Sequence, residues 1–209
     1  MAIVTRDRAR ALWLQTLTLI PAGIAIDFVG KTVAQLAGLP IFLDTIGTVI
    51  VAIIAGPWAG AVTGLLGNTV FALIIRPTAL PFALINMLSG IVAGYLYRRG
   101  MFRSFWRIFV SGLIIAAVNT VGAVPIIVFV FGGATGTGAD LVTSFFVAAG
   151  HKLFAAVLSS QAIISPTDKI ITVFIAWAIV LRLPARWRSR SGPLNLLWRG
   201  DKVESNDGQ

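Results

Sequence analysis

The sequence predicts an all-α integral membrane protein, folded as a bundle of six transmembrane helices with one external helix that does not span. Of the 209 residues, 57% are hydrophobic and 12% are charged, and the mean hydropathy is +0.89. A soluble domain of this size cannot hide so much apolar surface. The apolar runs are long and lack the alternation of β-strands, which favours helices over a barrel.

Basic residues gather in three clusters, and these clusters determine the expected topology. They lie at residues 6–10, 98–107 and 182–202. Cytoplasmic loops carry an excess of Lys and Arg, so all three clusters should lie on the cytoplasmic side of the membrane. Both termini are then cytoplasmic. The net charge of +9 therefore reflects membrane topology, and we expect no binding to nucleic acid.

The hydropathy pattern divides the chain into seven apolar segments, at residues 11–36, 43–55, 58–75, 81–97, 105–131, 140–163 and 166–184. The basic clusters allow only six crossings, so one of the last two segments does not span. We assign this role to residues 140–163, because His151 and Lys152 lie near its middle and central charges are costly in lipid. The connection 132–166 should then lie outside and pack on the bundle.

The last spanning helix is expected to begin at the sequence Ser165-Pro166-Thr167. Ser165 or Thr167 suits an N-cap, and Asp168 then places negative charge in the first turn. Residues 1–186 are predicted to form one membrane domain, and residues 187–209 a flexible cytoplasmic tail. At the other end, the apolar run after Arg10 continues past any small-residue cleavage site, so we expect it to be retained rather than removed as a signal peptide.

Residues 43–68 are predicted to form a helical hairpin around the turn GPWAG at residues 56–60. Pro57 cannot lie inside a helix without disturbing it, so one helix should end and another begin at this turn. Small residues four apart then form a row that lets another helix approach closely, namely Gly56, Gly60 and Gly64. Two interpretations stay open, which are packing within this chain and docking of a second membrane protein.

Polar residues interrupt the apolar sequence near the external connections at 37–44, 76–81 and 132–166, where we expect a ligand site. The candidate ligand-binding residues are Asp27, Lys31, Asp44, Asn68, Arg76, Asn86, Asn119, His151 and Lys152. Their charges and amide groups suit the polar edges of a small molecule. Four phenylalanines near the same helix ends can stack on an aromatic ligand or serve as core residues, namely Phe42, Phe82, Phe129 and Phe131.

Each candidate also has a purely structural interpretation. Asp27 and Lys31 stand four apart and can neutralise each other on one helix face. Asp44 can cap the helix that follows it. The three asparagines can bond between helices, and Arg76 can anchor the chain at the membrane interface. The charged pair at positions 151 and 152 can simply be exposed.

Metal, nucleotide and catalytic sites are not expected from this sequence. The chain has no cysteine and one histidine, which leaves too few nitrogen and sulfur donors for a metal site. The Gly-rich stretch at 132–138 lacks the lysine of a phosphate-binding loop, and HExxH and G-x-S-x-G motifs are absent. We therefore expect no cofactor and no enzymatic activity. An autonomous transporter or channel stays open as an alternative to a binding subunit.

Four sequence phrases occur in order along the chain, within a resemblance that extends over most of residues 11–186. They are GLPIFLDTIGT at 38–48, GPWAG at 56–60, PTALPFA at 77–83 and DKII at 168–171. Together they resemble the S component, the substrate-binding membrane subunit, of energy-coupling factor (ECF) vitamin transporters.

The resemblance implies a protein of the bacterial plasma membrane with six helices and cytoplasmic termini. It implies capture of a vitamin-like molecule outside, and delivery inward with a membrane scaffold protein and two ATPases. Which vitamin or micronutrient is captured stays open.

The resemblance also implies where the scaffold protein docks. In the family the first three helices face the scaffold, often through two alanines four residues apart on the first helix. This chain has no such alanine pair in residues 11–36. The nearest equivalents are Thr18 with Ala22 and Gly30 with Ala34, and the glycine row at 56–64 is the stronger candidate for docking.

Overall fold

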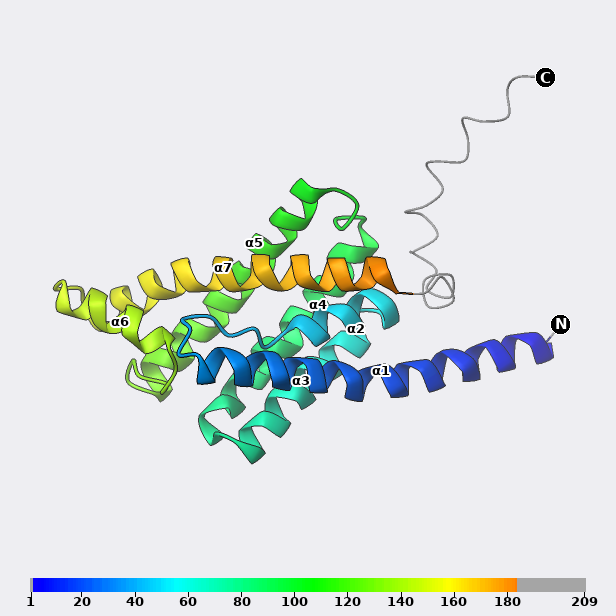
Figure 1. Ribbon diagram of the computed structural model, residues 1–209, viewed down its shortest axis with the longest axis horizontal. Coiled ribbons are helices and arrows are strands. Elements are labelled where there is room, and N and C mark those ends of the chain that lie inside the picture. The colour runs from blue at the N-terminus through cyan, green and yellow to red at the C-terminus, as the bar shows by residue number, and fades with distance from the viewer. Residues whose placement is uncertain (1, 184–209) are drawn as a thin grey trace, which may run out of the picture.

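The computed structural model describes residues 2–183, with side chains from Thr18 onward. Its elements are α1 (Ala2–Leu36), α2 (Ile46–Ala55), α3 (Pro57–Ile74), the 3₁₀ helix η1 (Pro77–Phe82), α4 (Ala83–Arg98), α5 (Phe105–Pro125), the π-helical turn η2 (Ile126–Val130), α6 (Ala139–Ala148) and α7 (Leu153–Arg182). The described part of the chain contains no strand, so the all-α prediction is confirmed for these residues (Figure 1).

The helices run between two ends of the molecule, which we call the basic end and the pocket end. The start of α1 and the end of α7 lie on the same side of the bundle, and α6 lies on the opposite side (Figure 1). The α2–α3 turn joins the basic end, because Gly56 lies next to the side chain of Arg98 at the end of α4. The pocket end comprises residues 37–45, 75–82 and 131–152. Which side of a membrane each end faces stays a prediction.

Within the described residues, five helices are long and apolar enough to span a membrane, at residues 18–36, 57–74, 77–98, 105–130 and 153–182. The chain also passes between the two ends at residues 37–55, but this pass contains only the 10-residue helix α2. The structure thus supports five of the six expected spanning helices, and the span at 43–55 stays a prediction. The short α6 lies between α5 and α7 as expected, and its position outside the membrane likewise stays a prediction.

The expected boundary between the last two apolar segments is wrong. Helix α7 runs without interruption from Leu153 to Arg182 and contains Pro166. The residues expected to start a helix therefore lie inside one. The charges that argued against a span, His151 and Lys152, precede α7 and are not at the centre of an apolar segment. Proline removes one hydrogen bond from a helix, and here Ser165 fastens the same turn to α5 by donating to the carbonyl of Ala116 (3.1 Å).

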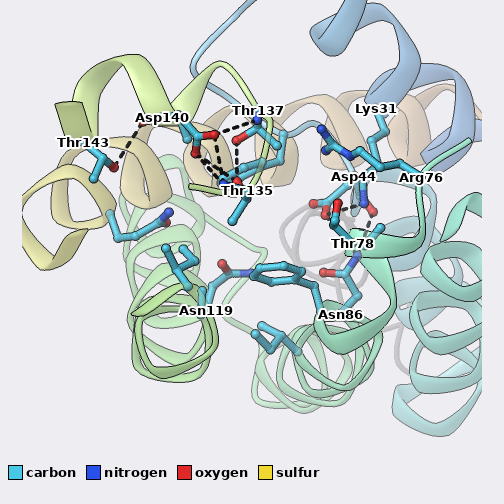
Figure 2. A pocket seen from close by; sticks show the side chains of 18 residues that line it. Lys31, Asp44, Arg76, Thr78, Asn86, Asn119, Thr135, Thr137, Asp140 and Thr143 are labelled. Atoms are coloured by element: carbon cyan, nitrogen blue, oxygen red, sulfur yellow. Dashed lines mark hydrogen bonds and ion pairs between the residues drawn. The ribbon is translucent and has the colours of Figure 1, made fainter. Parts of the chain in front are cut away.

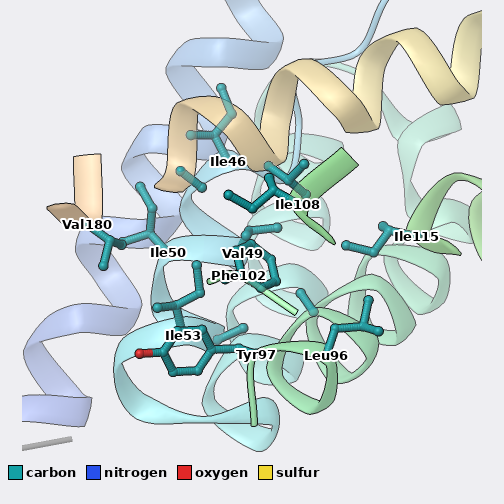
Figure 3. Close-up of a cluster of buried hydrophobic side chains, with 14 residues drawn as sticks. Ile46, Val49, Ile50, Ile53, Leu96, Tyr97, Phe102, Ile108, Ile115 and Val180 are labelled. Atoms are coloured by element: carbon teal, nitrogen blue, oxygen red, sulfur yellow. The ribbon is translucent and has the colours of Figure 1, made fainter. Parts of the chain in front are cut away.

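Helix α2 lies at the centre of the largest hydrophobic core. Its residues 46–53 are all buried, as expected for a helix that is apolar on every side. Figure 3 shows Ile46, Val49 and Ile50 of α2 packed with side chains of α4, α5 and α7. The predicted turn between α2 and α3 is confirmed, with Gly56 at a φ of 99° between the two helices.

The glycine row of α3 packs within the chain. A Cβ added at Gly64 would lie 2.6 Å from the carbonyl carbon of Asn86 on α4. One at Gly60 would meet the backbone of Gly90 on α4 and the side chain of Ala52 on α2. Both glycines are buried. This arrangement corresponds to the first of the two interpretations, close approach of helices of the same chain.

The small residues of α1 divide between its two faces. Gly30 and Ala34 face inward, where Gly30 contacts the backbone of Leu43 and Ala34 is buried. Thr18 and Ala22 are exposed. The inward pair thus packs on the chain itself, and the exposed pair remains accessible to another protein.

Candidate ligand-binding pocket

A pocket opens at the pocket end of the bundle, where α1, α4, α5, α6, α7 and the connecting segments converge. Its empty space, including the open mouth, is about 640 Å³. The polar lining residues are Lys31, Asp44, Arg76, Thr78, Asn86, Asn119, Thr135, Thr137, Asp140, Thr143 and Gln161 (Figure 2). The apolar lining residues are Phe42, Ala79, Phe82, Ile85, Ala123, Ile127 and Ala139. A concave site lined by apolar side chains together with a few polar groups is typical of sites for small organic molecules.

One wall of the pocket is charged and centres on Asp44, in the segment before α2. Its carboxylate lies 3.0 Å from the ammonium of Lys169 on α7 and accepts a hydrogen bond from the amide of Asn86 on α4 (3.1 Å). The ammonium of Lys31 on α1 lies 3.8 Å away. Asp44 therefore joins three helices, and its oxygens are largely occupied by the protein.

Lys169 is a buried cation between two carboxylates. It is 1% exposed and lies 2.7 Å from Asp168 as well as 3.0 Å from Asp44. Asp168 in turn accepts the backbone N–H groups of Phe42 (3.0 Å) and Leu43 (2.7 Å). This pairing holds the non-helical segment before α2 against α7. It also satisfies backbone groups that would otherwise lack partners inside the protein.

Asn68 supports the charged wall from behind and does not line the pocket. Its side-chain oxygen accepts a hydrogen bond from the ammonium of Lys31, and its amide nitrogen donates to the carbonyl of Ala79 (2.7 Å). The same ammonium lies 4.6 Å from the centre of the Phe71 ring, in a cation–π contact. Asn68 and Phe71 together position Lys31 at the pocket surface.

Asp27 belongs to the framework of the fold, since it caps the start of α2. Its carboxylate accepts the backbone N–H groups of Gly47 (2.7 Å) and Thr48 (3.1 Å) and the hydroxyl of Thr48 (2.6 Å). A carboxylate at a helix N-terminus is favourable, both as a hydrogen-bond acceptor and against the helix dipole. Among the described residues Asp27 forms no ion pair with Lys31, so the expected pairing within α1 is not formed.

Arg76 and the loop 135–140 close the upper rim of the pocket. The Arg76 guanidinium donates to the carbonyl of Gly136, which joins the segment after α3 to the loop before α6. That loop is folded around Asp140, which accepts the N–H groups of Thr135 (3.0 Å) and Thr137 (3.2 Å), among others. Burial lowers the pKa of Arg76 and the nearby Asp140 opposes this, but a guanidinium keeps its charge at neutral pH.

The opposite wall is neutral and carries carboxamides and hydroxyls. Asn119 on α5 and Gln161 on α7 both line the pocket and are buried. Beside them Thr143 on α6 shares a hydrogen bond with Ser160 (2.8 Å). Figure 2 shows Asn119 and Thr143 on one side of the pocket and Lys31, Asp44 and Arg76 on the other. The pocket thus has two ends of different chemistry.

The structure brings five of the nine predicted ligand-binding residues to the pocket, namely Lys31, Asp44, Arg76, Asn86 and Asn119. Asn68 lies directly behind them, and Asp27 caps α2. His151 and Lys152 are exposed in the link between α6 and α7, where the His151 ring packs against Phe146 (5.6 Å between ring centres). Their contact with a ligand stays untested, and the structure places them outside the pocket lining.

The sequence did not lead us to predict Gln161, which lines the pocket, or Lys169, which pairs with Asp44. The signal for Lys169 was present, because an adjacent acid and base inside an apolar run mark a functional or protein-lined position. It was assigned to a helix start because Pro166 suggested a helix boundary. Gln161 lies in the segment 140–163, which was not expected to span, and it was not among the predicted site residues.

We expect Asn119→Ala to weaken ligand binding, while His151→Ala leaves it unchanged. Asn119 reaches the cavity and makes no hydrogen bond within the described residues, whereas His151 is exposed outside it. Loss of one or two hydrogen bonds to a ligand corresponds to a decrease in affinity of about 10-fold. Equilibrium binding to the purified variants checks this, and weaker binding by the His151 variant alone would place the ligand elsewhere.

The described residues contain no group of three His, Asp or Glu side chains suited to a metal ion. No curated protein and no solved structure matches the chain. A family model described as "ECF transporter, substrate-specific component" matches residues 15–180. With that match over most of its length, and with a polar pocket at one end of an apolar helical bundle, the chain belongs to the family of ECF transporter substrate-specific components.

Proposed function

We propose that this protein captures a water-soluble vitamin or related micronutrient outside the bacterial plasma membrane and delivers it inward. The observation that carries this proposal is the pocket, which lies at the end opposite the basic residues of the α4–α5 turn and α7. If the basic end is cytoplasmic, as positively charged loops indicate, the pocket faces outward. Its many polar groups suit a ligand that is soluble in water.

Delivery against a gradient needs an energy source that this chain does not provide. The sequence has no phosphate-binding loop, so ATP hydrolysis is assigned to two partner ATPases joined through a membrane scaffold protein. This assignment rests on family membership, and the subunits themselves stay a proposal. The chain would then be a transport subunit and not an enzyme.

Native mass spectrometry of the gently purified protein, combined with thermal unfolding in a panel of vitamins, tests the proposal. We expect a bound molecule of vitamin size, and a higher unfolding temperature when that molecule is added. An empty protein that no vitamin stabilises would contradict the proposal. Uptake into proteoliposomes that contain this chain alone, without ATPases, would instead favour an autonomous transporter.

The exposed face of α1 is the proposed docking surface for the scaffold protein. Thr18 and Ala22 are exposed and small, so a helix of another protein can approach closely there. Gly60 and Gly64 are occupied by α4 and α2 and are not part of this proposed surface.

We expect Ala22→Leu to reduce assembly with the scaffold protein by about 10-fold or more, because the larger side chain holds the two helices apart. Ligand binding should not change, since Ala22 lies outside the pocket lining. The matched control is Ala117→Leu, at an exposed alanine of α5. Co-purification of tagged subunits measures assembly. Equal recovery of both variants would exclude this face of α1 as the docking surface.

A further inference from the structure

Among the residues that the structure describes, two buried carboxamides of the pocket have no hydrogen-bond partner. Gln161 is 1% exposed, and its side-chain oxygen makes no hydrogen bond to any described residue. Asn119 is 6% exposed and likewise makes none within the described residues. The two lie on adjacent antiparallel helices, one turn nearer the pocket end than the contact between Ser165 and the Ala116 carbonyl. A buried amide without a partner is costly, so these groups are suited to bonds that a ligand supplies.

The charged wall carries two cations that face the cavity and are incompletely neutralised. The Lys31 ammonium has one hydrogen-bond acceptor, Asn68, and its distance of 3.8 Å from Asp44 is too long for a hydrogen bond. Arg76 forms no ion pair within the described residues. In this described region its donors reach only neutral acceptors. These are the carbonyl of Gly136 and the side-chain oxygen of Gln35, once the Gln35 amide is turned toward the guanidinium (2.9 and 3.0 Å). The Nε–H of Arg76 has no partner in the part of the chain that the structure describes.

The carboxylates near this wall are already engaged by the protein. Asp44 accepts hydrogen bonds from Lys169 and Asn86. Asp168 forms an ion pair with Lys169 (2.7 Å) and accepts two backbone N–H groups. Asp140 and Asp27 each accept several hydrogen bonds from the loop or helix that they cap. Among the described residues, a cationic ligand would find no carboxylate here that the protein has not already engaged. An anionic ligand would find an ammonium and a guanidinium with donors to spare.

We infer that the ligand is a small organic acid whose carboxylate binds Lys31 and Arg76, and whose opposite end presents neutral N–H, O–H or C=O groups to Asn119 and Gln161. The side chains of Phe42, Phe82 and Ile85 contribute the apolar lining of the same cavity. This inference rests on the proposed function and narrows its substrate class. It favours vitamins that carry a carboxylate over vitamins that are neutral or cationic.

Matched pairs of compounds that differ only at the acid group test the inference. The probes are pantothenate with pantothenol, biotin with biotinamide, and nicotinate with nicotinamide; riboflavin and thiamine represent vitamins without a carboxylate. Binding to the full chain in detergent is measured by titration calorimetry. We expect one acid to bind about 10- to 100-fold more tightly than its neutral partner, as charge-assisted hydrogen bonds predict.

Variants assign each end of the bound molecule. Arg76→Gln should remove most of the preference for the acid over its neutral partner. Gln161→Leu should weaken the binding of the acid and the binding of its neutral partner by a similar factor of about 10. Arg98→Gln, which changes an exposed arginine at the basic end, is the matched control and should alter neither affinity.

The possible results separate the substrate class from the function itself. Tight binding of riboflavin or thiamine, or equal binding of an acid and its neutral partner, would overturn the inference and leave the proposed function intact. An equal loss of both affinities in Arg76→Gln would exclude Arg76 as the carboxylate contact. If no probe binds, the molecule that mass spectrometry finds bound to the purified protein tests the inference instead. A bound molecule without an acid group overturns the inference. An empty protein would count against both proposals.

Discussion

Replacement of Lys169 by methionine is expected to destabilise the protein by about 3–5 kcal/mol, the range for removing one partner of a buried ion pair. Lys169 is 1% exposed and lies 3.0 Å from Asp44 and 2.7 Å from Asp168. Without its ammonium, two carboxylates face each other inside the bundle. The effect is measured by thermal unfolding in detergent, with the loss of monodisperse protein as the readout.

Two further variants distinguish an electrostatic effect from a general loss of a long side chain. Lys152→Met changes an exposed lysine and should shift stability by no more than about 0.5 kcal/mol. Asp168→Asn combined with Lys169→Met should recover part of the loss, because the asparagine oxygen can still accept the N–H groups of Phe42 and Leu43. If Lys169→Met unfolds at the same temperature as Lys152→Met, the buried charges do not hold α7 in place.

Substitution of Gly64 by alanine is expected to cost about 2–3 kcal/mol, whereas the same change at Gly67 should be tolerated. The new Cβ at position 64 would lie 2.6 Å from the carbonyl carbon of Asn86, a rigid backbone atom, and would force α3 away from α4. At position 67 the nearest atom is 3.7 Å away, an ordinary contact. Both glycines lie on α3, so intrinsic helix propensity favours alanine equally at each.

Thermal unfolding of the two alanine variants tests this packing. Position 86 also lines the pocket, so Gly64→Ala should weaken ligand binding as well as stability. Equal unfolding temperatures for Gly64→Ala and Gly67→Ala would mean that α3 and α4 can separate at little cost. That result would reopen the glycine row as a surface for another helix.

The sequence predicts local features of this fold well. The turn at residues 56–60 was predicted because Pro57 suits the first position of a helix, and the structure has α2 ending at Ala55 and α3 beginning at Pro57. The candidate site was predicted in part. Lys31, Asp44 and Arg76 are polar residues where apolar helices end, and the fold brings these ends together. Their contact with a ligand stays a prediction.

The remaining features depend on partners that are distant in the sequence. Asp44 and Lys169 are 125 positions apart, so no local pattern contains their pairing. Pro166 suggested a helix boundary because the local cost of proline is visible in the sequence. The packing of α5 against the same turn, through Ser165, is not visible there. Gln161 was consequently not recognised as a pocket residue on a continuous helix.

Helix α2 is the shortest helix among the passes between the two ends, and the non-helical segment before it lines the pocket. The other passes are helical over 16 residues or more, while α2 begins only at Ile46 and follows a non-helical segment that contains Phe42 and Asp44. One added helical turn would advance the chain by about 5.4 Å and bring four more side chains into this region. Because this pass is not helical before Ile46, its segment fills less space beside the pocket than a helix would. The position at which α2 begins therefore helps to set the room beside Phe42 and Asp44 in this chain.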